Sequence, residues 1–349
     1  MKDGIETMAE KNVILEVRDL SVSFVADNRE TRIVKNVSFD VKRGKTLAVV
    51  GESGCGKSVT MNGILRLLGR NAKMTAEKIA FYEKRPQGDM KVHHIHTFKK
   101  ANGKEMNYLR GQKISMVFQD PMSSLDPVYR VGDQVMEALR QHNKISRGEA
   151  RRKTVELFRK LGIPDPEKRM KCYPHEFSGG MKQRVVIAIA MICSPDLIIC
   201  DEPTTALDVT IQAQIMDILR ELQDTLGISI VMITHNMGLV AQMASEVCVM
   251  YMGRIVERGA VEDIFDHPRH PYTAALLRSV PVLGADGAAR LETIPGVTPD
   301  PSELGEGCEF ADRCGYCTEE CRRGEIPERE AGSGHTVRCI HYLKEEAAS

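Results

Sequence analysis

The stretch TLAVVGESGCGKSVTMNGILRLLG, residues 46–69, decides the fold of this chain. It opens with the apolar run TLAVV, which is typical of a buried strand. Residues 51–58 then fit the pattern GxxxxGKS, and the helical stretch VTMNGILRLLG follows them. In such a loop the glycines let successive backbone N–H groups point at phosphate oxygens, and the start of the helix adds positive potential. Strand, loop and helix in this order predict an α/β domain that binds a nucleotide.

Each residue of this phosphate loop has an expected task. Lys57 would reach the β and γ phosphates of the nucleotide, and Ser58 would bind a magnesium ion. The rest of the loop would surround the phosphates. The residues predicted to bind the nucleotide here are Gly51, Ser53, Gly54, Cys55, Gly56, Lys57 and Ser58.

The stretch LIICDEP, residues 197–203, supplies two carboxylates. Asp201 leaves the end of an apolar strand, where a carboxylate is costly unless it serves a metal, and bound magnesium would be that metal. Glu202 is placed to accept a proton from, or to orient, the water that attacks the γ phosphate. A solvent-exposed Asp-Glu pair at a strand end is common, but the phosphate loop in the same chain favours the catalytic interpretation.

The composition limits what else the chain can be. At roughly 150 residues per domain, 349 residues suggest about two domains. Lys plus Arg and Asp plus Glu both total 48, and a net charge of zero does not favour a broad nucleic-acid interface. Residues 1–12 contain no apolar leader, and the longest apolar run, 185–193, is far below the roughly 18 residues that span a bilayer. We therefore expect a cytoplasmic protein without a nucleic-acid partner.

The first part of the chain predicts antiparallel strands. Apolar and polar residues alternate in short runs from about 13 to 50, as in half-buried strands. Residues 75–111 are polar, and they are interpreted as strands and loops. His93, His94 and His96 lie there without a carboxylate or thiolate partner nearby, so a solvated loop is favoured over a metal site.

The remainder of the chain follows an α/β pattern. DLIICDEP and ISIVMITH are continuous apolar strands on either side of a helical stretch at 210–226. Helical periodicity also dominates from about 131 to 161 and from 179 to 193. Proline and glycine become frequent further on, and a domain boundary is expected at 260–270.

The stretch FSGGMKQR, residues 177–184, places a serine and two glycines directly before a helical run, which is a second anion site at a helix start. It resembles the signature motif of ABC-type ATPases, in which Ser178, Gly179 and Gly180 of one subunit would close on the γ phosphate held by the partner. The resemblance implies a head-to-tail dimer with composite ATP sites. It also implies a RecA-like core with an antiparallel β subdomain and an α-helical subdomain at about 122–185.

Other motifs of that family follow in the expected order. Gln119 in VFQDP matches the glutamine that contacts magnesium and water and links the site to the membrane subunits. Asp208 in TALD matches the loop across the dimer interface, and His235 in MITH matches the histidine that holds the γ phosphate. Phe24 lies where the family usually places an aromatic ring under the adenine. Met181 replaces the glutamine that most of the family has, so it is assigned no nucleotide contact.

Three stretches between residues 267 and 314, HPRHPYTAALLRSVP, IPG and CEFADRC, narrow the family. They closely resemble the extended ATP-binding subunits of dipeptide and oligopeptide importers, a group that includes nickel transporters. The resemblance implies an ATP-binding domain at 1–262 and a C-terminal extension with a cysteine cluster at 263–349. It further implies an ATPase that uses Mg²⁺ and ATP to drive uptake of di- or oligopeptides, with nickel or a metal chelate as the alternative cargo.

The same resemblance implies partners. They are a second ABC ATPase subunit, usually a related but different chain, two transmembrane permease subunits, and an extracellular binding protein that delivers substrate. The chain would lie on the cytoplasmic face of the cell membrane. The alternative is a soluble ABC ATPase that acts on DNA or ribosomes, which the zero net charge, the single cassette and the lack of a long coiled-coil insertion disfavour. Glu202 and His235 disfavour a non-hydrolytic regulatory subunit.

The stretch GCEFADRCGYCTEEC, residues 307–321, holds four cysteines. In a reducing cytosol such a cluster favours metal binding or catalysis over disulfides. The family resemblance points to Cys308, Cys314, Cys321 and Cys339 as ligands of a 4Fe-4S cluster, which would give this tail a reason to fold. Zinc is the rival, because paired cysteines two to four residues apart suit it, with His335 or His341 completing the set. Cysteines without any ligand are the third possibility.

Overall fold

The structure is a computed structural model, and it describes residues 12–279, apart from 28, 86 and 206, and residues 293–342. Residues 1–11, where the sequence predicts no apolar leader, lie outside the described residues. Within the described part of the chain, no helix combines the length and the apolar character that crossing a membrane requires.

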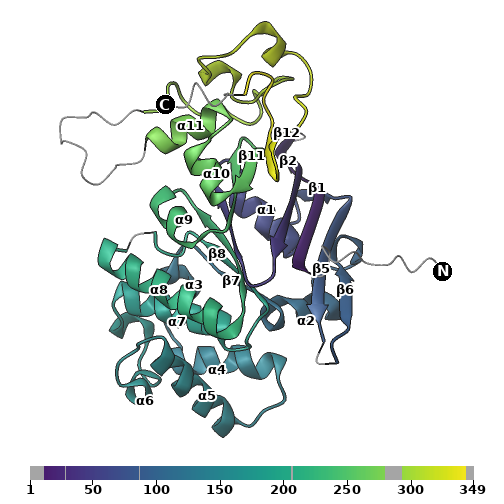
Figure 1. The fold of residues 1–349 in the computed structure, drawn as a ribbon. Helices are drawn as coiled ribbons and strands as arrows, with labels where there is room; N and C mark the ends of the chain where they lie inside the picture. Colours follow the sequence, from purple (N-terminus) through teal and green to yellow (C-terminus); the bar gives the residue numbers. More distant parts are fainter. Residues whose placement is uncertain (1–11, 28, 86, 206, 280–292, 343–349) are drawn as a thin grey trace.

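An eight-stranded sheet forms the centre of the molecule (Figure 1). Its order is β12-β13-β11-β10-β3-β9-β8-β7, and the five strands from β10 to β7 are parallel. Every residue of β3, β8 and β9 is buried, as expected for continuous apolar strands covered on both faces. The parallel strands are β3 (Thr46–Val50), β7 (Ile114–Val117), β8 (Leu197–Asp201), β9 (Ser229–Thr234) and β10 (Glu246–Tyr251), and the antiparallel ones are β11 (Arg254–Ala260), β12 (Arg329–Gly332) and β13 (His335–Val337).

A second, antiparallel sheet holds the N-terminal strands that the alternating pattern predicts. The region 75–111, expected to be strands and loops, also contains helix α2 (Lys104–Gln112), in which only Met106 and Leu109 are buried. Two buried apolar residues are too few to show a helical periodicity in the sequence, so α2 was not predicted. The strands are β1 (Val13–Ala26), β2 (Arg29–Lys42), β4 (Ala72–Thr75), β5 (Lys78–Lys84) and β6 (Met90–His94), and the short 3-10 helix η2 (Ile95–Thr97) follows them.

The structure places His93 and His94 in strand β6 and not in the solvated loop that the sequence favours, although His94 is exposed. His93 is buried, and its Nε2 lies 2.8 Å from Glu83 Oε2. Tyr108 and Lys113 contact the other oxygen of Glu83 at 2.5 Å and 3.2 Å. His93 therefore has a structural role in a buried polar group, because a buried carboxylate needs such partners.

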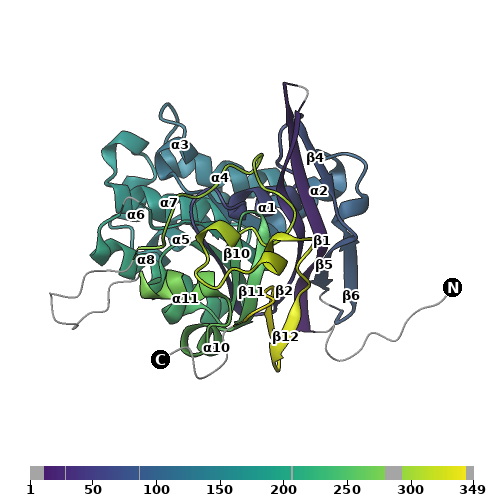
Figure 2. The same ribbon diagram turned by 90° about the horizontal axis from the view of Figure 1, so that it is seen from above.

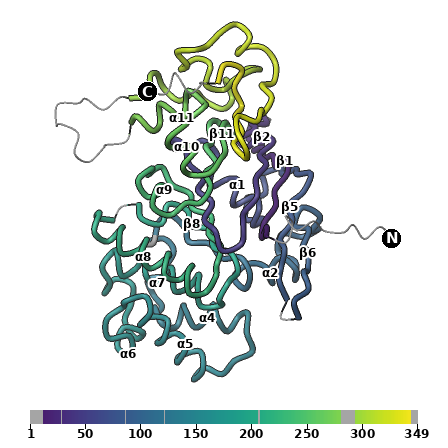
Figure 3. The backbone as a smooth tube through the Cα atoms, in the orientation of Figure 1, coloured from purple at the N-terminus to yellow at the C-terminus, as the bar shows by residue number. Residues whose placement is uncertain are grey.

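Helices cover the central sheet and form a separate group at one end of it (Figure 3). The predicted helical stretch 131–161 is two helices, since Ser146 caps the second by accepting a hydrogen bond from Glu149 N at 3.2 Å. The helices are α1 (Lys57–Ile64), α3 (Pro121–Ser124), α4 (Val131–His142), α5 (Arg147–Lys160), α6 (Pro166–Arg169), η3 (Pro174–Glu176), α7 (Gly179–Met191), α8 (Val209–Leu226), α9 (Met237–Met243), α10 (Val261–Asp266), α11 (Pro271–Arg278), η4 (Ala311–Arg313) and η5 (Glu319–Arg322).

The C-terminal part of the chain packs on the central sheet. β13 pairs with β11, with Glu257 opposite Val337 and Arg258 opposite Thr336. Phe310 is buried in the same core as the parallel strands. Figures 1 and 2 both show β12 near β11, and β13 lies between these two strands in the sheet. The segment after residue 293 therefore shares the sheet and the core of the preceding region.

Candidate active site

Four neighbouring strands bring the predicted site residues to one edge of the central sheet. The phosphate loop follows β3, His235 follows β9, Asp201 ends β8, and Gln119 lies two residues after β7. These strands are adjacent and parallel, in the order β3-β9-β8-β7. Ligands of open α/β sheets bind at the carboxyl ends of the strands, where these residues lie.

The backbone of the phosphate loop requires glycine at both ends. A Cβ atom on Gly51 would lie 2.1 Å from Met250 O, and one on Gly56, whose φ is +102°, would lie 3.1 Å from Ile33 O. The side chain of Cys55 is buried, so only its backbone is available to a phosphate. Ser53 and Gly54 are exposed at the turn. The loop is thus a tight cradle of backbone N–H groups.

Lys57 lies inside this cradle. Its side chain is buried, and its Nζ donates to Gly51 O at 2.7 Å and to Glu52 O at 2.8 Å. An ammonium group held by two carbonyl oxygens in the loop is placed to exchange them for phosphate oxygens. The loop therefore has the shape and the charge that fit a nucleotide phosphate.

Ser58 and Asp201 form the metal side of the site. Ser58 Oγ donates to Asp201 Oδ1 at 2.9 Å. Asp201 is buried, and this burial, with the nearby charge of Glu202, raises the pKa of its carboxyl. A buried carboxylate beside a hydroxyl gains stability from a hard cation, since Mg²⁺ prefers oxygen ligands. The two residues therefore fit the magnesium ion that the sequence predicts.

Glu202 is the centre of a cluster of polar side chains. Gln119 Nε2 donates to Glu202 Oε2 at 2.9 Å, and His235 Nδ1 lies 3.2 Å from Glu202 Oε1. Burial opposes ionisation of Glu202, but the hydrogen bonds of Thr205 and His235 outweigh it and lower the pKa of the carboxyl. The backbone N–H of Glu202 donates to Ile233 O at 2.9 Å, and its φ is +46°. The site therefore holds an ionised carboxylate in a fixed position.

Thr205 belongs to this cluster, although the sequence analysis missed it. Its Oγ1 donates to Glu202 Oε2 at 2.8 Å. The signal was available, because a threonine hydroxyl three residues after a glutamate can return to it across a tight turn. Glu202 therefore has three side-chain partners.

The remaining predicted residues lie at the starts of two helices. Ser178 caps α7 by accepting from Met181 N at 3.4 Å, and Asp208 caps α8 by accepting from Ile211 N at 2.9 Å. A Cβ atom on Gly180 would lie 2.7 Å from Ile211, so the two helix starts pack closely. Ser178, Gly179 and Asp208 are exposed. Their hydrogen bonds are to their own helices, and they form an open surface.

Phe24 lies apart from the cluster around Glu202. It is in β1, opposite Thr31 of β2 and Ala72 of β4, and it is half-buried. One part of the ring packs against the core of the antiparallel sheet. The described contacts therefore give Phe24 a packing role, and a contact with adenine remains a prediction.

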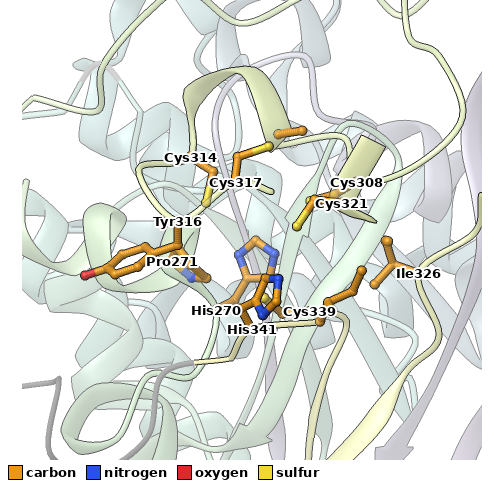
Figure 4. A pocket seen from close by; sticks show the side chains of 12 residues that line it. His270, Pro271, Cys308, Cys314, Tyr316, Cys317, Cys321, Ile326, Cys339 and His341 are labelled. Atoms are coloured by element: carbon orange, nitrogen blue, oxygen red, sulfur yellow. The ribbon is translucent and has the colours of Figure 1, made fainter. Parts of the chain in front are cut away.

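The cysteines predicted to hold a 4Fe-4S cluster line one pocket (Figure 4). They do not form a metal site: in residues 12–279 and 293–342, no group of three or more His, Cys, Asp or Glu side chains is arranged to hold a metal ion. All ten cysteines are free thiols. The prediction of a cluster on Cys308, Cys314, Cys321 and Cys339 is therefore wrong, and the same finding removes the zinc alternative.

The physical reason is that other contacts fold this segment. Burial raises the pKa of Cys308 to about 12 and that of Cys339 to about 11, so both side chains pack as neutral thiols. Aromatic packing and backbone hydrogen bonds contribute as well. Phe310 packs edge to face on Tyr251 at a centroid distance of 5.3 Å, and Cys308 N donates to Cys321 O at 2.7 Å. Packing and hydrogen bonds hold the segment that was expected to depend on a metal.

Comparisons with known proteins agree with this site. A family described as "ABC transporter" matches residues 34–205, and one described as "Oligopeptide/dipeptide transporter, C-terminal region" matches residues 256–321. The dipeptide transport ATP-binding protein DppD of Bacillus subtilis is 46% identical over 336 residues, which cover 96% of this chain and 96% of that protein. The oligopeptide transport ATP-binding protein OppD of the same bacterium is 45% identical over 325 residues, which cover 93% of this chain and 88% of that protein.

Solved structures share the fold. The ATP-binding cassette MJ0796, in a dimeric post-hydrolysis state bound to ADP and Pi, has a TM-score of 0.59 at 23% identity and covers 71% of this chain and 99% of its own. The structure of cbiO1 from Clostridium perfringens has a TM-score of 0.58 at 26% identity. It covers 73% of this chain and 92% of its own. These likenesses confirm the predicted ABC ATPase fold. The chain belongs to the ABC transporter family, as an ATPase subunit in the group of the peptide-transport ATP-binding proteins.

Proposed function

We propose that this ATPase subunit energises the import of di- or oligopeptides through an ABC transporter. One observation carries the catalytic part, namely that Gln119, Thr205 and His235 converge on Glu202 beside the Ser58–Asp201 pair. The peptide cargo is supported by the names of relatives that match this chain over nearly its whole length. Nickel or a metal chelate is the alternative cargo. The division into an ATP-binding domain at 1–262 and a C-terminal segment at 263–349 belongs to this proposal.

The residues around the phosphate loop bind ATP. Gly51, Gly54 and Gly56 let the backbone follow the phosphates, and Lys57 leaves its two carbonyl partners to contact the β and γ phosphates. Ser58, Asp201 and Gln119 would hold Mg²⁺, which neutralises phosphate charge during the transfer. Phe24 would contact the adenine.

Glu202 acts on the water that attacks the γ phosphate. Its carboxylate, ionised through its hydrogen bonds, accepts the proton of that water or orients it. Thr205 donates to Oε2 of this carboxylate at 2.8 Å, which limits its rotation. His235 is largely exposed beside Glu202 and is free to contact the γ phosphate.

A second ATPase subunit completes the site. Ser178, Gly179, Gly180 and Asp208 lie at two helix starts, and three of them are exposed. A helix start presents unpaired N–H groups and positive potential, which favour an anion brought by another subunit. The dimer would be head to tail, with a related but different chain as the partner.

Replacing Ser178 with Arg is expected to leave ATP binding by the single subunit unchanged and to abolish closure of the dimer. The large cation would occupy the exposed helix start where the partner's γ phosphate belongs. ATP binding is measured by equilibrium titration with a fluorescent ATP analogue, and closure by ATP-dependent cross-linking of the assembled transporter.

The matched control is Ser146→Arg, which changes the exposed serine that caps α5. This variant should lose the same kind of cap without any effect on closure. ATP-dependent closure of the Ser178→Arg transporter at the parent level would contradict the composite site.

Exposed apolar side chains beside Gln119 support a binding site for the permease subunits on this segment. Phe118, Met122, Val128 and Tyr129 are exposed large hydrophobic residues on one short segment that follows β7. Such a group of exposed apolar residues marks an interaction surface. The segment is continuous with Gln119, which contacts Glu202, so a permease docked there would sense the state of the site. The chain would then lie on the cytoplasmic face of the membrane, below two permeases that receive peptide from an extracellular binding protein.

Reconstitution with these partners tests the proposal. The complete transporter in vesicles should hydrolyse ATP faster when the binding protein and a dipeptide are added together. If nickel chelates stimulate the ATPase rate and dipeptides do not, the cargo is the metal chelate and not a peptide. An ATPase rate that responds to DNA or ribosomes, and not to the permeases, would overturn the transport function.

A further inference from the structure

Glu52 connects the phosphate loop to the C-terminal part of the chain. Arg313 Nη1 donates to Glu52 Oε2 at 2.6 Å, and Arg313 Nη2 donates to Glu52 Oε1 at 3.0 Å. Thr298 Oγ1 donates to Glu52 Oε2 at 3.2 Å, and the backbone N–H of Glu52 donates to the hydroxyl of Tyr272 at 2.9 Å. Three segments that follow the cassette in sequence therefore hold one residue of the loop.

Arg313 is itself fixed in place. Its side chain is 6% exposed, and its Nε donates to Pro295 O at 2.8 Å. The guanidinium lies over the rings of Tyr251 and Phe310, at 5.8 Å and 5.9 Å from their centroids. The hydrogen bond to Glu52 holds the pKa of Arg313 above its usual value. A buried, charged fork that several contacts hold can set the orientation of the carboxylate that it binds.

The backbone of Glu52 in turn sets the position of Lys57. The carbonyl oxygens of Gly51 and Glu52 accept hydrogen bonds from Lys57 Nζ, and Glu52 O also accepts from Cys55 N at 3.4 Å. A rotation of the peptide at Glu52 would move the acceptors of Lys57 and the first turn of the cradle together. The path from Arg313 to the phosphate-binding amine therefore passes through a single residue.

We propose that Arg313 is a positioning residue of the ATP site, which acts through Glu52 to hold the first turn of the phosphate loop. The C-terminal segment is then part of the nucleotide site, across a separation of 261 residues. This inference rests on the proposed role of residues 51–58 in binding ATP. The cluster around Glu202 follows β7, β8 and β9, whereas the hydrogen bonds of the Arg313 side chain go to Glu52, Pro295 and the Tyr251 hydroxyl.

The test is Arg313→Met in the full chain, because methionine keeps an apolar stem against Tyr251 and Phe310 and removes the fork. We expect the dissociation constant for N-methylanthraniloyl-ATP to rise about tenfold, as for a misplaced binding group. In the assembled transporter the KM for ATP should rise by the same factor, and kcat should stay within about twofold of the parent. Glu52→Gln should have the same effect, and the double variant should be no weaker than either single one.

Arg313→Lys keeps the charge without the fork and should restore only part of the affinity. It also keeps the proposal testable if Arg313→Met fails to fold. The matched control is Arg254→Met, since Arg254 is 15% exposed and binds the same C-terminal segment through Glu309 at 2.7 Å and Glu325 at 2.9 Å. Arg254→Met should lower the melting temperature and leave the affinity for N-methylanthraniloyl-ATP unchanged.

Three results would overturn the role of Arg313. They are parent affinity in Arg313→Met, an equal further loss when Arg313→Met is added to Glu52→Gln, and an equal loss of affinity in Arg254→Met. ATP binding by a Lys57→Ala variant distinguishes a wrong role for Arg313 from a wrong assignment of the phosphate site. If Lys57→Ala binds ATP like the parent, residues 51–58 are not the phosphate site; if only the Arg313 variants are unchanged, the positioning role alone is wrong.

Discussion

Glu202→Gln is expected to bind ATP like the parent and to hydrolyse it at least about a hundredfold more slowly, which is typical for loss of a general base. Glutamine has the same shape, and its amide oxygen can still accept from Gln119 and Thr205, so the dimer should close on ATP and remain closed. It cannot accept a proton from water. The measurement is single-turnover hydrolysis in the assembled transporter, with ATP binding followed separately.

Glu221→Gln is the matched control for this variant. Glu221 is an exposed residue of α8, and it lies toward the opposite end of that helix from Asp208. Loss of this carboxylate should leave both ATP binding and ATP hydrolysis unchanged. Parent turnover in Glu202→Gln would show that another group activates the water.

Lys57→Ala is expected to weaken ATP binding itself, by about a hundredfold, because hydrogen bonds to charged groups contribute about 1.5–3 kcal/mol each. The ammonium contacts phosphate oxygens in the ground state and in the transition state, so both affinity and kcat/KM should fall. The loss is measured by titration of the full chain with a fluorescent ATP analogue. Hydrolysis at saturating ATP then reports how much of the effect belongs to binding.

Lys45→Ala provides the comparison for the lysine. Lys45 is exposed and immediately precedes β3, whereas Lys57 lies beyond the other end of the strand. Removing this charge should leave the affinity for ATP unchanged. A Lys57→Ala chain that binds ATP as tightly as the Lys45→Ala chain would contradict the phosphate-loop assignment.

Local patterns predicted the catalytic edge of the sheet well. The run of 46–69 contains the strand, the loop and the helix start as neighbours in sequence, so short-range chemistry was sufficient. The buried strand before Asp201 was equally clear, since the first four residues of β8 are apolar and Asp201 ends the strand. Residues that follow such strands meet at one edge for geometric reasons alone, and Gln119, Glu202 and His235 do so.

Contacts between distant segments were not predictable in the same way. The pair of Glu52 and Arg313 joins residues 261 positions apart, and neither side chain shows a pattern that marks the other. The attachment of β13 to β11 also escaped prediction, because β13 is only three residues long. The boundary at 260–270 was predicted from the frequent prolines and glycines that follow, and it stays a prediction. Residues on both sides of it share a sheet and a core.

The cysteine tail shows how far spacing can mislead. Spacing and resemblance correctly gathered Cys308, Cys314, Cys321 and Cys339 around one pocket. They could not supply the geometry of ligation, which no group of three or more potential ligands among the described residues has. A count of potential ligands is thus weaker evidence than the arrangement and charge of those ligands.

The hairpin of β12 and β13 has a consequence for solubility. Without it, β11 would present unpaired N–H and C=O groups beside Glu257 and Arg258, and such an edge is a template for pairing with another chain. β12 replaces that edge with a strand of four residues, on which Arg329 and Glu330 are exposed charges. Short length and charge both discourage strand addition. A version of the protein that ends before residue 329 would therefore expose an aggregation-prone sheet edge. An assay of its ATPase activity would have to distinguish aggregation from a direct loss of catalysis.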